Sequence, residues 1–166
     1  MNHKDKYIAI QGHECLSACL AGILNPINHE INSSAIITLG AGMEITYNTS
    51  EDVISSNMYN ANYNFLNRYH ICYECNTIAI DATYESIDQT FCELLNENVL
   101  PIIKLNPANL TYHRVFAQAQ SSIHYICLTG YEDDSYYILD NYVPSYIVTT
   151  FEGKVKKEYI IKAFIH

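Results

Sequence analysis

Residues 10–24 read IQGHECLSACLAGIL, and this stretch decides how the rest of the chain is interpreted. A polar segment, QGHE, runs directly into Cys15 and then into small and apolar residues with helical spacing. Pro26 follows shortly afterwards and cannot continue a helix, so we predict a helix over 15–24. The sequence therefore predicts a cysteine at the N-terminus of a helix.

A cysteine in that position has a chemical consequence. The thiolate is the nucleophilic form, and the N–H groups and dipole of a helix N-terminus lower the pKa of a thiol. The same N–H groups can stabilise a tetrahedral oxyanion, with a nearby amide side chain as a second donor. We therefore predict a lowered pKa and a nucleophilic role for Cys15, and an oxyanion role for Gln11, four residues upstream. The alternative for Cys15 is a small residue that is simply buried in the helix.

A nucleophilic cysteine needs a base and a group that orients the base. His124 opens the β-patterned run 123–131, and Asp140 stands at the end of the next β-patterned run. A three-residue hairpin loop, EDD, would set Asp140 opposite Ile126, with His124 as its diagonal neighbour on the same face. A loop with an even number of residues would send the two side chains to opposite faces. A core histidine and a turn-forming aspartate are the alternatives.

The motifs around these residues resemble a known superfamily. HECLSACLAGIL (13–24) resembles the nucleophile helix of papain-like cysteine peptidases in their compact bacterial form, which trim double-glycine leaders from bacteriocins. HYICLTGYEDDSYYILDNY (124–142) is similar to the hairpin that carries their base and acid. IITLGAGMEITY (36–47) and LTYHRVFAQAQSSIHYI (110–126) are similar to segments in the N-terminal domain of the butirosin-biosynthesis acyltransferase, which moves an acyl group from a carrier-protein thioester to an amine. Relatives of this size include an amide synthetase of thioamide antibiotic assembly.

The resemblance implies a papain-like α+β fold in which an N-terminal nucleophile helix packs on an antiparallel sheet. It implies that Cys15 is the nucleophile, that His124 is the general base and that Asp140 orients the base. Gln11 matches the oxyanion glutamine, which in the peptidases usually lies further upstream, where this chain has Ala9. The implied activity is that of an acyltransferase or amide synthetase. It would take its acyl group from the phosphopantetheine arm of an acyl or peptidyl carrier protein, and it would need no other cofactor.

Two other functions fit the same residues. A cysteine peptidase of the bacteriocin leader-processing type would use the same three catalytic residues, so the triad does not discriminate between the two enzymes. A binding module on a degenerate papain-like scaffold would need none of them. Tyr112 and His113, in LTYHRVF, either line a substrate channel or lie in the core, and His113 is an alternative base.

The segment HICYEC raises the question of a metal. Cys72 and Cys75 have C-x-x-C spacing, and His70 lies close by. Structural zinc sites usually need a second pair of ligands at similar spacing, and the chain has none. In the strand that we predict over 70–80, the two cysteines would also point to opposite faces. We therefore predict no metal site and no redox pair.

Composition limits the class of protein. A chain of 166 residues is predicted to form a single domain over 1–166, and its helical patterns precede a late run of strands, which favours α+β. The net charge of −9 argues against nucleic acid and is compatible with a small cationic amine as acceptor. We see neither a signal peptide nor an apolar stretch of membrane-spanning length, so we expect a cytoplasmic protein with no membrane partner.

The remaining elements are predicted from local patterns. We expect a strand–turn–strand unit over 33–48, a helix over 85–98 with Ser86 as N-cap, a strand over 99–105, an irregular connection over 109–122, a strand over 145–151 and a last helix over 154–166.

Overall fold

The computed structural model describes residues 2–42, 44–50, 53–56, 58–69, 83–118, 122–145 and 147–164. Within these residues the main sheet is antiparallel and contains, in spatial order, β3 (Ile102–Leu105), β4 (His124–Glu132), β5 (Ser135–Asp140) and β6 (Phe151–Lys156). The helices are α1 (Cys15–Leu24), α2 (Ser33–Leu39), α3 (Met58–Arg68), α4 (Tyr84–Asn96) and α5 (Lys157–Ala163). A hairpin of β1 (Ile45–Asn48) and β2 (Val53–Ser56) and two 3₁₀ turns, η1 (Pro107–Asn109) and η2 (Arg114–Gln118), complete the described elements. The predicted α+β class is confirmed.

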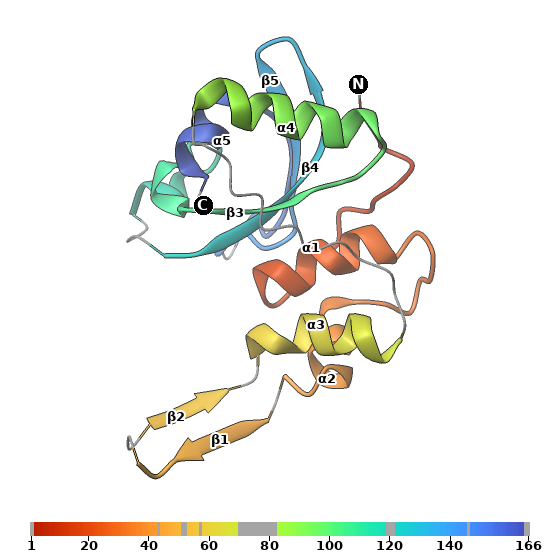
Figure 1. Cartoon of the computed structure of the whole chain (residues 1–166), viewed down its shortest axis with the longest axis vertical. Helices are drawn as coiled ribbons and strands as arrows, with labels where there is room; N and C mark the ends of the chain where they lie inside the picture. The colour runs from red at the N-terminus through yellow and green to blue at the C-terminus, as the bar shows by residue number, and fades with distance from the viewer. Residues whose placement is uncertain are drawn as a thin grey trace.

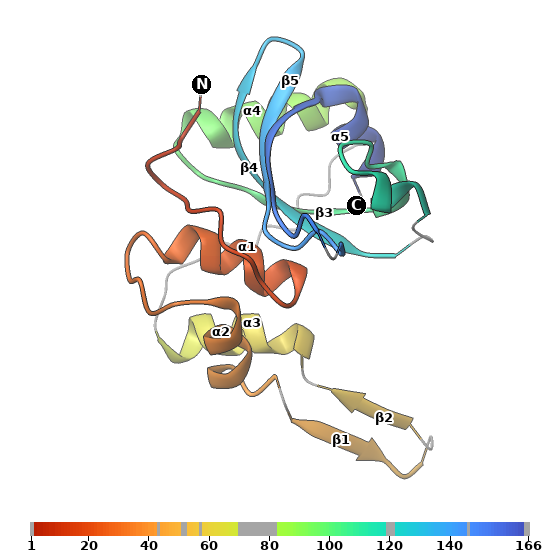
Figure 2. The ribbon, with the colours of Figure 1, turned by 180° about the vertical axis from the view of Figure 1, so that it is seen from behind.

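Helix α1 lies between the sheet and a layer formed by α2 and α3 (Figures 1 and 2). On one side Ala21 belongs to a cluster with Ile36 of α2 and Phe65 of α3. On the other side Ile23 packs against a cluster that contains Leu139 of β5. A helix that is apolar all round is typically buried, which explains the small and apolar residues of this segment. The predicted bounds of the helix, 15–24, are confirmed.

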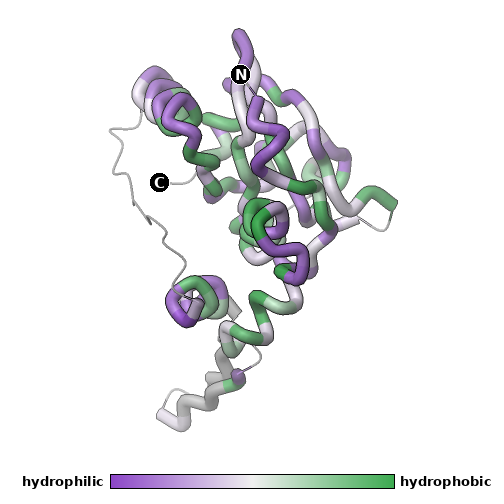
Figure 3. Tube along the Cα trace, turned by 90° about the vertical axis from the view of Figure 1, so that its right-hand side faces the viewer, coloured by the Kyte–Doolittle hydropathy of each residue, from purple (hydrophilic) through white to green (hydrophobic). Residues whose placement is uncertain are grey.

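The opposite face of the sheet is covered by α4 and α5, which also contact each other. Phe91 of α4 and Ile160 of α5 share one core cluster with Ile126 and Ile138 of the sheet. Figure 3 shows hydrophobic segments both in the sheet-containing part and in the helices beside it, while the β1–β2 hairpin extends away from the sheet at the other end of the molecule. Among the described residues, no helix combines the length and apolar character needed to cross a membrane.

The β4–β5 hairpin puts His124 and Asp140 on one face by a route that differs from the predicted one. Its loop has two residues, because Glu132 pairs with Ser135, and Asp133 in the loop adopts a left-handed φ of 49°. An even loop alone would separate the two side chains, but a register shift between Leu128 and Gly130 restores the alternation. The predicted three-residue loop is therefore wrong, and the predicted face is correct.

The strand predicted for the first half of 33–48 is wrong, since this segment forms helix α2. The side chain of Asn32 caps the helix by accepting a hydrogen bond of 3.0 Å from the N–H group of Ala35. Ile36 and Ile37 are buried, so tertiary packing outweighs their preference for strands. The second half does form a strand, β1.

Three further predictions are also wrong: the cap of α4, the strand over 145–151 and the start of the last helix. Helix α4 is capped by Thr83, whose hydroxyl oxygen accepts from the N–H group of Ser86, so Ser86 lies inside the helix. The described residues 145 and 147–150 of the strand predicted over 145–151 form no strand, and Ile147 is 82 % exposed. Phe151, the last residue of that segment, begins β6. Because β6 pairs with β5 as far as Lys156, helix α5 begins only at Lys157.

The strand predicted over 70–80 lies outside the described residues. The same holds for His70, Cys72 and Cys75, whose predicted lack of a metal or redox role stays a prediction.

Candidate active site

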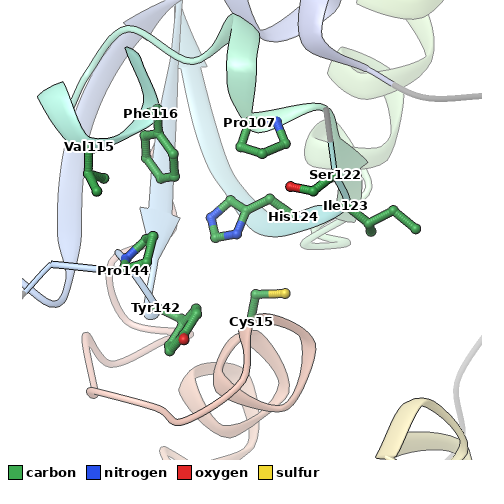
Figure 4. Close-up of a pocket in the computed structure, with 9 residues that line it drawn as sticks. All are labelled: Cys15, Pro107, Val115, Phe116, Ser122, Ile123, His124, Tyr142 and Pro144. Atoms are coloured by element: carbon green, nitrogen blue, oxygen red, sulfur yellow. The ribbon is translucent and has the colours of Figure 1, made fainter. Parts of the chain in front are cut away.

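A pocket of about 380 Å³ opens where α1 and β4 both begin (Figure 4). It is lined by Cys15, Pro107, Val115, Phe116, Ser122, Ile123, His124, Tyr142 and Pro144. These residues come from the start of α1, the connection between β3 and β4, the start of β4 and the loop after β5. The pocket thus joins segments that are far apart in the chain, and its walls are mostly apolar.

His124 lines this pocket, is buried and forms a hydrogen bond with Asp140. Its Nε2 donates to Oδ2 of Asp140 at 2.9 Å, and the two residues are 5 % and 0 % exposed. A carboxylate in its ionised form can only accept, so in that form the ring donates through Nε2, and a neutral ring then has its lone pair on Nδ1. Phe116 packs against the ring, with 5.3 Å between the centroids. With the ring proton on Nε2, Nδ1 can accept a proton, as a general base must.

Asp140 has two further hydrogen-bond donors. The hydroxyl of Tyr112 donates to Oδ2 at 2.7 Å, and the backbone N–H group of Tyr142 donates to Oδ1 at 3.0 Å. Burial and the neighbouring Asp140 charge raise the pKa of the Tyr112 phenol well above its usual range, so the phenol keeps its proton and remains a donor. The buried carboxylate therefore accepts from a side chain, a backbone group and the imidazole at once, which fixes its position.

The environment of Cys15 differs from the one predicted. Glu14 is the N-cap of α1, and its carboxylate accepts from the N–H groups of Leu16 at 2.9 Å and Ser17 at 2.8 Å. Burial of the thiol and the charge of Glu14 raise the pKa of Cys15 to about 12. The predicted lowering is therefore wrong, because burial disfavours the thiolate and the carboxylate of Glu14 adds its own repulsion at the positive end of the helix.

The Cys15 thiol is turned toward Glu14. Its Sγ donates to Oε1 of Glu14 at 3.3 Å, and in Figure 4 the sulfur points away from the imidazole although both side chains line the pocket. One turn of the helix later, Cys19 is fully buried. The structure thus presents Cys15 as a protonated thiol across the pocket from His124.

The three other predicted site residues do not line this pocket. Gln11 is exposed and lines a second pocket, so its oxyanion role stays a prediction. Tyr112 lies against Phe116 and stacks on Phe151, with its hydroxyl on Asp140. Tyr112 thus takes the core position of the two that its sequence allows. His113 accepts a hydrogen bond from a backbone N–H group through Nδ1 at 3.2 Å and lies edge-on to Phe116.

Asn141 joins the two sides of the site, and no local pattern in the sequence indicates this role. Its Nδ2 donates to the carbonyl of Ala18 in α1 at 3.0 Å, and its Oδ1 accepts from the N–H group of Ile10 at 3.1 Å. Its backbone carbonyl accepts from Gly12 at 2.9 Å. A Cβ on Gly22 would come within 2.3 Å of Asn141 Nδ2, so glycine allows this close approach.

Other residues of the site also went unidentified. Glu14 carried a local signal, because an acidic residue directly before a predicted helix is a common N-cap. Phe116 and Tyr142 carried none, since nothing local to them indicates which pocket they line.

Comparisons of the chain with models of protein families, with curated proteins and with solved structures find no match.

Proposed function

We propose that this protein is a cysteine acyltransferase with a papain-like arrangement of its nucleophile helix and its base-bearing sheet. The observation that carries the proposal is the shared pocket: a thiol and an imidazole line it, and a fully buried carboxylate holds the imidazole. In the proposed reaction an acyl group passes from a thioester to Cys15 and then to an amine. Cys15 is the nucleophile, His124 the general base and Asp140 the group that orients it.

The first step exchanges one thioester for another. The thiol proton of Cys15 passes to Nδ1 of His124 while the sulfur attacks the thioester carbonyl of the donor. The new C–S bond forms, the old C–S bond breaks, and the departing thiolate takes the proton back from the imidazolium. Asp140 keeps the ring in the required tautomer throughout this exchange. The products are an acyl-enzyme and a free donor thiol.

The raised pKa of Cys15 determines how this step begins. With a pKa of about 12 the thiol is protonated at neutral pH, so a preformed thiolate–imidazolium pair is not the resting state. Rotation about the Cα–Cβ bond of Cys15 turns the sulfur from Glu14 toward the imidazole, and proton transfer accompanies attack. We therefore assign His124 the role of a general base in the acylation step.

The walls of the pocket support an acyl donor of low polarity. Val115, Phe116 and Ile123 present apolar side chains, and two prolines add to them. Such walls favour an acyl chain delivered on a phosphopantetheine arm, and they limit the access of water, which would hydrolyse the acyl-enzyme. The proposed donor is accordingly an acyl or peptidyl carrier protein, and the proposed acceptor is a small amine.

Intact-mass measurement after mixing with an acyl thioester of N-acetylcysteamine tests the proposal. We expect wild type to gain one acyl mass, Cys15→Ala to gain none, and Cys92→Ala to behave as wild type. Cys92 is a matched control, because it is also half-buried and its thiol lies outside the pocket. An adduct that persists in Cys15→Ala, or none on wild type, contradicts the proposal.

Product analysis then separates transfer from hydrolysis. Adding an amine to the acylated wild type should yield amide and speed the loss of the adduct. Release of free acid at the same rate with and without amine indicates a hydrolase. Cleavage of a double-glycine leader peptide by the same preparation identifies the peptidase.

A further inference from the structure

A second pocket, of about 420 Å³, lies beside the first. It is lined by Gln11, Gly12, His13, Tyr142, Val143, Pro144, Ser145 and Thr149. Tyr142 and Pro144 line both pockets, so they form a common wall between the two spaces. His13 also stands only two residues before Cys15, which lines the first pocket. The second pocket therefore opens next to the position of the proposed acyl-enzyme.

Backbone hydrogen bonds fix both walls of this second pocket. The N–H group of Gly12 donates to the carbonyl of Asn141 at 2.9 Å, which ties the segment before α1 to the end of β5. The N–H group of Val143 donates to the carbonyl of Thr149 at 2.8 Å, which closes the loop on the other side. A Cβ on Gly12 would come within 2.2 Å of the Cβ of Ala18, so only glycine allows this wall to lie so close to α1. The pocket is built into the same framework as the candidate active site.

The chemistry of the two pockets differs. Apolar side chains and prolines predominate in the first, whereas the residues that line the second carry an amide, an imidazole and three hydroxyls, from Gln11, His13, Tyr142, Ser145 and Thr149. Among the described residues that line the second pocket there is neither a carboxylate nor a lysine or arginine. Such a lining offers hydrogen bonds to an uncharged polar molecule and no ion pair to a charged one.

We propose that the second pocket binds the amine acceptor in its uncharged form. This inference rests on the proposed acyl transfer and assigns the acceptor a subsite of its own. An amine attacks a thioester only through its free lone pair, and a carboxylate in the pocket would instead stabilise the ammonium form. The net charge of −9 attracts ammonium ions to the molecule as a whole, and the uncharged pocket accepts the deprotonated fraction.

The transfer step follows from this placement. The amine nitrogen, reaching past Tyr142 and Pro144, attacks the carbonyl carbon of the acyl-enzyme. A C–N bond forms and the C–S bond to Cys15 breaks. The proton lost by the nitrogen passes to Nδ1 of His124 and from there to the departing sulfur. The polar groups of the second pocket take part only in holding the acceptor.

Binding can be tested without catalysis by titrating glycinamide, a small polar amine, into Cys15→Ala above the pKa of the amine. We expect saturable shifts of the backbone amide signals of Gly12, Ser145 and Thr149 in NMR spectra, and none at Ile123 in the first pocket. Thr149→Val should weaken binding about three- to tenfold, the loss of one neutral hydrogen bond. The matched control Thr150→Val, next along the chain and outside the pocket lining, should bind as before. Should Thr149→Val fail to fold, His13→Ala, which removes an exposed side chain, serves in its place.

The outcomes keep this inference separate from the proposed function. Shifts at Ile123 but not at Thr149, or no shifts at all, overturn the acceptor subsite even if wild type forms an acyl-enzyme. Conversely, saturable binding in the second pocket together with an unacylated wild type leaves the subsite standing and rejects the acyl transfer. Where both hold, Thr149→Val should raise the amine concentration needed for half-maximal transfer and leave the rate of acylation by the thioester unchanged.

Discussion

The two sides of the candidate site each contain a carboxylate, and the two carboxylates have opposite effects. Asp140, at the end of β5, is fully buried and holds the imidazole of His124 by a hydrogen bond. Glu14, at the start of α1, caps the helix and raises the pKa of the thiol beside it. On the hairpin side an imidazole is hydrogen-bonded to a buried carboxylate, whereas on the helix side the raised pKa keeps the Cys15 thiol protonated.

The carboxylates of Asp140 and Glu14 differ in the groups that donate hydrogen bonds to them. Asp140 accepts hydrogen bonds that the fold itself supplies, from Tyr112 and from the backbone of Tyr142. Glu14 accepts from backbone groups as well, but those N–H groups are the ones that would otherwise stabilise a thiolate or an oxyanion. In this chain Glu14 already occupies those N–H groups, and burial of the Cys15 thiol disfavours the thiolate further.

Substituting Asp140 should lower the rate of acyl transfer more than any other change on the hairpin side. In Asp140→Asn the side-chain amide can donate to the ring, which favours the tautomer with the proton on Nδ1 and removes the base. We expect acyl transfer to fall by about 10³- to 10⁴-fold, the loss that such a change causes in catalytic triads. The rate of thioester consumption measures it. Asp133→Asn, in the exposed hairpin turn, is the matched control, and a loss below tenfold in Asp140→Asn would remove Asp140 from the mechanism.

Asn141→Ala should weaken the connection between the two sides. The substitution leaves the carbonyl of Ala18 and the N–H group of Ile10 without their partner on this side chain. Each buried group that loses its hydrogen bond costs about 1–3 kcal/mol, so we expect unfolding to become easier by about 2–4 kcal/mol. Urea unfolding measures the change. In the control Asn28→Ala only an exposed bond to Glu30 is lost, and similar losses in both variants would argue against the connecting role.

The contrast between the two sides also limits what the sequence predicts. The start and end of α1 follow from Cys15 and Pro26 because helix signals are local. The shared face of His124 and Asp140 was predicted from a loop length that is wrong. The actual loop is one residue shorter, and a register shift that no local pattern indicates compensates for it.

The remaining differences have the same physical origin. SSAIITL was predicted to be a strand from its β-branched residues, but Asn32 caps it as a helix and packing against α1 and α3 outweighs its propensity. The link from Asn141 to α1 joins residues far apart in the chain, so no spacing indicates it. The effect of Glu14 was within reach of the sequence, since its position before the helix predicts a cap that opposes the thiolate.

Tyr112→Phe should show whether the hairpin side needs its phenol. The substitution removes one donor from Asp140 and keeps the ring that stacks on Phe151. A hydrogen bond to a charged group contributes about 1.5–3 kcal/mol, so we expect the turnover rate to fall by about 10- to 100-fold while the concentration of thioester for half-maximal rate stays constant. Steady-state kinetics measure both. The control Tyr137→Phe loses a bond to the exposed Glu132 and should retain wild-type rates. Equal rates in the two variants would show that the phenol does not help to position Asp140.

The smallest effect is expected at Glu14, and it changes in the opposite direction. Glu14→Gln keeps a side-chain oxygen that can cap α1 but removes the negative charge beside the thiol. The pKa of Cys15 should therefore fall below its value of about 12, and the pH midpoint of alkylation by iodoacetamide should fall with it. At a fixed pH below that midpoint the alkylation rate should rise severalfold. The exposed Glu93→Gln, on α4, is the control.

This last variant decides between the two causes of the raised pKa. If the midpoint stays unchanged in Glu14→Gln, burial alone keeps Cys15 protonated, and the helix side differs from the hairpin side only in its solvation. If the midpoint falls and acyl transfer also slows, Glu14 has two roles: its charge raises the pKa of the thiol, and its carboxylate orients the thiol for transfer. A lower midpoint with unchanged or faster transfer supports the description of Glu14 as a cap that restrains the nucleophile. In that case the difference between the two carboxylates is electrostatic, because the cap geometry is retained and only the charge has been removed.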